Sequence, residues 1–381
     1  MDFVTNDCWC RLVNKQASKQ LNGNSRLDRR AFLLASMVAA VLPAPIWASQ
    51  IRAGGTRRIV VDPRIELMSV VHLLGGYFLN SEADTAYKRE ATAYFSAFRA
   101  HPVVSLATDL ASKTFSFDSV PNLLLRLTNP QSLTWRTDLD AEPLTGIPDT
   151  EERERFLALL RDFASVSRFG EFFNRNRRLY RRVARSIEPS VTPNVNALEA
   201  YAGASLGQWK VIPGLLLLDG GFGPRLRQQS GVFESYAIIG PLYNSVERPN
   251  FGDFGRLQNL IVHEFAHSLI NPLSNQHRDL VQGYSGRFDV VLREAMLRQG
   301  AYDNWQTVVD EHVVRAVTAR VAAKTRGSDA GAAAVVDEVN RGFIYVPALI
   351  ERLAPYEADR RVWPDLNAYY PNLLEAFDDR A

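Results

Sequence analysis

The residues whose types and spacing could do chemistry lie in the segment LIVHEFAHSL, residues 260–269. If this segment is helical, His263 and His267 lie about one turn apart on one face, so both imidazoles can reach a single metal ion. Glu264 then projects about 100° around the helix from His263 and can reach a water molecule activated by that ion. Two imidazole ligands with an adjacent carboxylate base are typical of zinc-dependent hydrolysis.

The neighbours of this motif favour a functional interpretation. Every other residue between 260 and 269 is uncharged, which indicates a buried helix that we expect to end at Asn271-Pro272. Two imidazoles and a carboxylate are costly to bury unless they bind a ligand or are hydrogen-bonded. The alternative is a helical domain without metal, in which both histidines are hydrogen-bonded core residues.

A zinc site needs a third protein ligand, and three residues after the motif are candidates: His277, Glu294 and Glu311. Glu311 is favoured because it stands in VVDEHVVRA, an apolar helical pattern in which an acid beside an imidazole is costly unless coordinated or paired. Its alternative role is an ion pair with Arg315, four residues further along the helix.

Residues 1–48 predict an export signal. Arg29-Arg30 precedes an apolar stretch, AFLLASMVAAVLPAPIWA, which is typical of a twin-arginine leader with a small residue at its end. Pro43 and Pro45 disfavour a stable membrane-spanning helix, so we expect cleavage after residue 48 and no stable membrane association afterwards. The twin-arginine export machinery would be a transient partner, and the mature protein would be periplasmic or secreted.

The leader also contains both cysteines, Cys8 and Cys10. The mature chain would therefore have no thiol, and any metal must be bound by histidine and carboxylate side chains. We expect residues 49–59 to form a linker and residues 60–378 to form the folded domain. With 44 basic and 42 acidic residues, the chain lacks the basic excess of a nucleic-acid-binding protein.

Periodicity predicts an α+β fold that is mainly helical, with a small antiparallel sheet beside the HExxH helix. The pattern is helical through residues 60–205, whereas strands are expected at 209–218 and 234–240. Helices return from residue 253, so residues 206–378 would form a strand-plus-helix half that contains the site. We expect the strand at 236–240 to line the substrate cleft as an edge strand.

Four segments carry a resemblance to a known family: VDPRIEL, VHEFAHSLINP, YDNWQTVVDEHVVRAVTAR and FIYVPALIERL. Together they resemble an uncharacterised bacterial zincin-like family of the gluzincin type. That family is catalogued as a domain of unknown function and regarded as metalloprotease-like. The resemblance covers roughly residues 58–378 and implies that Glu311 is the third zinc ligand. Gluzincins such as thermolysin place an Asp four residues after this Glu, where Arg315 stands here. The residue that orients a zinc-binding histidine must then come from elsewhere, and Asp310 and Asp289 are candidates.

These observations predict an exported zinc metallopeptidase that binds one Zn²⁺ through His263, His267 and Glu311 and hydrolyses a peptide or protein substrate. Glu264 would act as general base. The oxyanion would need a further donor, for which the sequence offers five candidates without choosing among them: Tyr236, Tyr243, Tyr284, Tyr302 and His312. The alternative is an exported zinc-containing binding or scaffold protein without turnover, which an intact Glu264 disfavours.

Overall fold

The computed structural model describes residues 58–80, 84–142, 144, 146–241, 250–251, 254–292, 302 and 304–378. The predicted leader, most of the predicted linker, Tyr243 and Glu294 lie outside these described residues. Within the described part of the chain, no helix is both long enough and apolar enough to cross a membrane.

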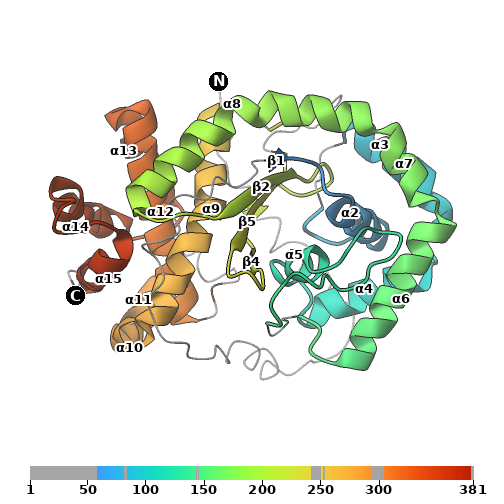
Figure 1. Cartoon of the computed structure of the whole chain (residues 1–381), viewed down its shortest axis with the longest axis horizontal. Coiled ribbons are helices and arrows are strands. Elements are labelled where there is room, and N and C mark those ends of the chain that lie inside the picture. The colour runs from blue at the N-terminus through green and yellow to red at the C-terminus, as the bar shows by residue number, and fades with distance from the viewer. Residues whose placement is uncertain are drawn as a thin grey trace.

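Helices dominate the first half of the described chain: α2 (Pro63–Gly75), α3 (Ala86–Phe95), α4 (Pro102–Lys113), α5 (Ser119–Leu125), α6 (Thr150–Val166), α7 (Phe169–Arg175) and α8 (Arg177–Ala202). The sequence pattern indicated a long helical segment over 151–187, but the helix breaks where Arg168 adopts a left-handed φ of 53°. Helix α8 arches from this group across the sheet and packs against the helices of the second half (Figure 1).

A small sheet lies at the centre of the molecule (Figure 1) and contains β1 (Arg58–Ile59), β2 (Gln208–Pro213), β3 (Gly221–Phe222), β4 (Arg225–Arg227) and β5 (Phe233–Ile239). Strands β1, β2 and β5 are parallel, whereas β3 and β4 pair antiparallel with β5. The predicted antiparallel sheet is therefore wrong in this respect, because the sheet is mixed. The predicted edge strand at 236–240 is also wrong, since it belongs to the inner strand β5, and β3 stands at the edge.

The second half returns to helices: α9 (Phe254–Gln276), α10 (Arg278–Gly283), α11 (Phe288–Leu292), α12 (Trp305–Arg326), α13 (Ser328–Asn340), α14 (Val346–Ala358) and α15 (Leu366–Leu374). Helix α9 does not end at Asn271-Pro272 as expected, because the helix continues through Pro272 to Gln276. Proline removes one backbone hydrogen bond, and packing of α9 against α12, α8 and β5 supports the helix around it.

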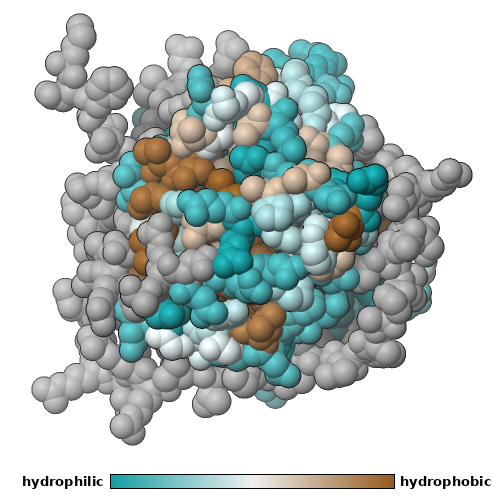
Figure 2. Space-filling model, turned by 90° about the vertical axis from the view of Figure 1, so that its left-hand side faces the viewer, coloured by the Kyte–Doolittle hydropathy of each residue, from teal (hydrophilic) through white to brown (hydrophobic). Residues whose placement is uncertain are grey.

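A single cluster of buried apolar side chains runs from Val61 to Phe377 and joins both halves of the chain. The mainly helical α+β class predicted from the sequence is confirmed. Figure 2 shows the face formed by the helices at the left of Figure 1, where hydrophilic residues separate the apolar patches. Exposed valines such as Val336, Val339 and Val362 are of the scattered kind that is normal on protein surfaces.

Candidate metal centre

Packing of α9 against α12 brings the three predicted ligands together. The Nε2 atoms of His263 and His267 lie 3.2 Å apart. Carboxylate oxygens of Glu311 lie 3.7 Å from Nε2 of His263 and 3.6 Å from Nε2 of His267. These side chains are 15%, 16% and 14% exposed, so water can reach the point on which their ligand atoms converge.

These distances fit a metal ion. Tetrahedral zinc with ligands at about 2.0–2.1 Å requires ligand atoms about 3.4 Å from one another, close to the separations of the three side chains. Two imidazoles and one glutamate form a donor set that zinc uses in catalytic sites. Among the described residues, this trio is the group of histidine and acidic side chains whose geometry could hold an ion.

The surroundings of both histidines suit the role of a metal ligand. Nδ1 of His267 lies 3.2 Å from Oδ1 of Asn271, one turn further along α9, and donation to this acceptor leaves the lone pair of Nε2 free. Burial, assisted by the positive charge of Arg315, lowers the pKa of His263 well below its ordinary value. Asn271 was missed as a partner because the sequence analysis ended the helix there.

Arg315 fixes the position of Glu311. One of its nitrogens lies 2.8 Å from the Glu311 carboxylate and another lies 2.7 Å from the carboxylate of Glu338 on α13. The guanidinium also stacks over the ring of Phe343, with 3.7 Å from its carbon to the ring centroid. The sequence presented the ion pair and the ligand role of Glu311 as alternatives, but the ion pair with Arg315 leaves Glu311 in a position that is compatible with the ligand role.

Glu264 lies beneath the edge strand β3. A Cβ atom at Gly221 would stand 2.6 Å from Oε1 of Glu264, and one at Gly223 would collide with the Glu264 carbonyl oxygen. Only glycine allows this close approach of strand to helix. Burial, followed by the negative charges of Asp118 and Glu311, raises the pKa of Glu264 well above its usual range. A carboxylate with a raised pKa is a stronger base.

Asp118, at the start of α5, faces this cluster from the first half of the chain. Asp118 is exposed to solvent, yet neighbouring groups of the cluster act on its charge. Desolvation and the charge of Glu311 raise the pKa of Asp118, whereas His267 acts in the opposite direction. Sequence analysis missed Asp118, because no local pattern connects it with a motif more than 140 residues away.

Comparison with known proteins assigns the family. A model for the domain of unknown function DUF4932 matches residues 58–376, which is most of the chain and includes every residue of the cluster. The chain belongs to the DUF4932 family. No curated protein and no solved structure matches it. The site of this DUF4932 protein must therefore be interpreted from its own geometry.

Other candidate ligands and partners lie elsewhere in the DUF4932 domain. The ring of His277 stacks on Tyr370, with 5.7 Å between centroids, and is not part of the cluster. Asp310 interacts with Ser274 and Gln306, and burial raises its pKa to about 7. Asp289 is exposed on α11. The histidine partner that the structure provides is Asn271.

Of the candidate oxyanion donors, Tyr302 is placed beside the cluster, since its hydroxyl lies 3.5 Å from Arg315. The hydroxyl of Tyr236 donates to Glu234. Tyr284 packs near Phe377, with 6.3 Å between ring centroids. His312 is buried, with its Nδ1 2.7 Å from the Val308 carbonyl oxygen, and burial lowers its pKa to about 4.

Proposed function

We propose that this protein is a zinc-dependent metallopeptidase. The observation that carries the proposal is the convergence of the ligand atoms of His263, His267 and Glu311, with the carboxylate of Glu264 beside them under an edge strand. Bound Zn²⁺ would activate a water molecule and polarise a peptide carbonyl. In this proposal the three side chains bind the metal ion, and Glu264 transfers the protons during bond cleavage.

Glu264 would accept a proton from the attacking water and later deliver it to the leaving nitrogen. Arg315 would keep the Glu311 carboxylate oriented through its second bond to Glu338. Tyr302, whose hydroxyl lies 3.5 Å from Arg315, is the candidate that we favour for donating to the oxyanion.

An extended peptide chain is the substrate that the sheet edge suits. Strand β3 ends the strand order, and among the described residues no strand pairs with its outer edge. A peptide that pairs there would gain main-chain hydrogen bonds beside Glu264, as in other cases of β-strand addition. This favours a peptidase over a hydrolase of small molecules.

Replacing Glu264 by Gln tests the proposal. Glu264→Gln keeps the shape of the side chain but removes the proton acceptor, so hydrolysis of a broad peptide library should fall by at least about 10²-fold while bound zinc is retained. Glu357→Gln is the matched control, because Glu357 pairs with Arg320 away from the cluster. Equal inactivity of wild type and Glu264→Gln, both zinc-loaded, would favour the binding or scaffold protein.

We also propose that the protein is exported, with Arg29-Arg30 and the apolar stretch after them as the signal. Sequencing the N-terminus of protein from the cell envelope should give a start near Ser49. Replacing both arginines by lysine should block export, whereas a full-length product in the cytoplasm would contradict the proposal.

A further inference from the structure

We propose that an apolar pocket beside β3, between α2 and α5, binds an aliphatic side chain of the peptide substrate next to the bond that is cleaved. This inference rests on the proposed peptidase function, and it specifies the substrate class of the same site.

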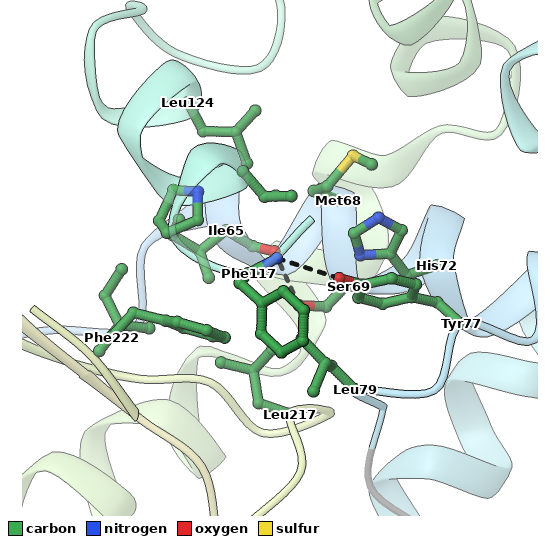
Figure 3. A pocket seen from close by; sticks show the side chains of 13 residues that line it. Ile65, Met68, Ser69, His72, Tyr77, Leu79, Phe117, Leu124, Leu217 and Phe222 are labelled. Atoms are coloured by element: carbon green, nitrogen blue, oxygen red, sulfur yellow. Dashed lines mark hydrogen bonds between the residues drawn. The ribbon is translucent and has the colours of Figure 1, made fainter. Parts of the chain in front are cut away.

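The pocket has walls from both halves of the chain (Figure 3). Met68 and His72 of α2 and Leu124 of α5 form its inner part, whereas Phe117, Leu217 and Phe222 stand nearer the surface. Met68 is 1% exposed and Leu124 is 0% exposed, whereas the three outer side chains are half-buried. The pocket is therefore reached from its outer side, where an incoming side chain would meet apolar atoms.

Two chain connections join this pocket to the candidate metal centre. Phe222 lines the pocket from β3, while its neighbours Gly221 and Gly223 lie directly against Glu264. Because successive residues of a strand face opposite sides of a sheet, β3 separates the pocket from the Glu264 carboxylate by a single strand thickness. On the opposite wall, Phe117 directly precedes Asp118, which faces the cluster.

A peptide paired with the outer edge of β3 would direct alternate side chains to the two faces of the sheet. Its backbone would lie beside Glu264, and a side chain on the other face would point toward the pocket. The position of the pocket is therefore the one expected for a residue that flanks the cleaved bond.

The wall at Phe117 is held in place before any ligand arrives. Phe117 has a left-handed φ of 49°, which is uncommon for a residue with a Cβ atom. The hydroxyl of Tyr77 accepts a hydrogen bond of 3.2 Å from the Phe117 backbone nitrogen, and Tyr77 also lines the pocket. Strained backbone that is fixed by a specific contact is a feature of ligand sites.

His72 contributes the one unpaired nitrogen among the side chains that line the pocket. Its side chain lines the pocket and is 6% exposed, and Nε2 has no hydrogen-bond partner within the described structure. Burial lowers the pKa of His72 to about 3, so the imidazole is neutral at physiological pH. An unpaired buried nitrogen of this kind costs free energy, and a hydrogen-bonding group such as a peptide amide or water satisfies it, whereas an aliphatic side chain does not.

The size and chemistry of the pocket define what it accepts. Its volume of about 30 Å³ holds about two water-sized groups, which suits the branched end of a leucine or valine side chain better than an indole ring. With apolar walls and a neutral imidazole, nothing in the lining compensates a charge. A lysine or glutamate side chain would lose its hydration, and no group of opposite charge in the lining would replace it.

The methyl group of Met68 gives a direct test of binding. Met68 is the only methionine among the described residues, so ¹³C-methyl labelling of methionine places a reporter inside the pocket. Titration of the zinc-loaded protein with N-acetyl-leucinamide should shift the Met68 signal, assigned with Met68→Leu, whereas N-acetyl-lysinamide should not. An unchanged Met68 signal with both compounds overturns the inference.

A substitution that fills the pocket tests the same inference with a peptide substrate. Leu217→Trp should lower kcat/KM for peptides with leucine at the selected position by about tenfold or more, and leave zinc content unchanged. Leu280→Ala, an exposed change on α10, is the control. If a peptide library is hydrolysed without preference for an aliphatic residue beside the cleaved bond, the inference is wrong while the proposed function stands. If no peptide is hydrolysed, both the proposed function and the substrate assignment are contradicted. A Met68 shift would then show only that the pocket binds an aliphatic side chain.

Discussion

The two halves of the chain each bury ionisable side chains, but they do so in different ways. In the first half, Glu66 is fully buried and accepts a 2.7 Å hydrogen bond from Tyr87, whose hydroxyl also contacts that of Tyr180 at 2.7 Å. Hydroxyls and a carboxylate here form a chain of donors and acceptors. In the second half, the potential ligand atoms of His263, His267 and Glu311 converge on one point.

We use this difference to distinguish a structural cluster from a candidate metal site. Burial shifts the pKa of at least one group in each cluster, so a perturbed pKa does not distinguish the two clusters. Convergence of lone pairs is the better criterion, because imidazole nitrogens and carboxylate oxygens directed at one another are stabilised by a proton or a metal ion between them. The comparison predicts that metal removal affects the second cluster and that pH affects the first.

Loss of a ligand should have the largest effect. His263→Ala, His267→Ala and Glu311→Ala should each reduce zinc from about one ion per chain toward none, measured by elemental analysis after desalting. Glu66→Gln and Glu294→Ala should keep the ion. If Glu294→Ala loses zinc and Glu311→Ala retains it, the third ligand has been misassigned and the cluster does not form the site.

Removal of Arg315 should have the next largest effect. Arg315→Gln leaves the half-buried Glu311 and Glu338 carboxylates without their shared partner, although Arg341 still lies 3.5 Å from Glu338. Zinc affinity should fall about 10–100-fold, as for lost partners of metal ligands, and stability should fall by less than the roughly 3–5 kcal/mol that is typical of a fully buried pair. The measurements are competition with a chelator and chemical denaturation.

Arg320→Gln is the control for Arg315, because Arg320 lies on the same helix and pairs with Glu357. It should leave zinc affinity unchanged. An equal loss of affinity in both variants would show that Arg315 acts through the stability of α12 and does not position Glu311.

The smallest effect should come from the first cluster. Burial raises the pKa of Glu66 to about 7 from an ordinary value near 4.5. Its contribution to stability is therefore fully present below about pH 4.5 and is lost as pH rises through about 7, by about 3 kcal/mol. Glu66→Gln cannot ionise, so its melting temperature relative to wild type should rise between pH 5 and pH 8. A constant difference across this range would contradict the assignment.

The sequence predicted the parts of the site that follow from local periodicity. His263, Glu264 and His267 share one helix, and the apolar pattern around Glu311 indicated a second helix against which it could pack. The structure brings these residues together. Spacing alone left Glu294 and His277 open as alternatives, because sequence separation does not fix how two helices pack.

What the sequence did not predict depends on tertiary contacts. Pro272 indicated a helix end, yet packing carries α9 past it and so positions Asn271 against His267. Gly221 and Gly223 are required by the close approach of β3 and the residue after it to Glu264. Asp118 reaches the cluster from a distant helix. None of these contacts has a signature within a short window of sequence.

The central claim is that the cluster binds one zinc ion through nitrogen and oxygen atoms, and X-ray absorption of the purified, zinc-replete protein tests it most directly. The account predicts one zinc per chain with a single shell of nitrogen and oxygen ligands at about 2.0–2.2 Å and no sulfur. Zinc that is absent after replete purification, or that is bound by sulfur, would contradict it.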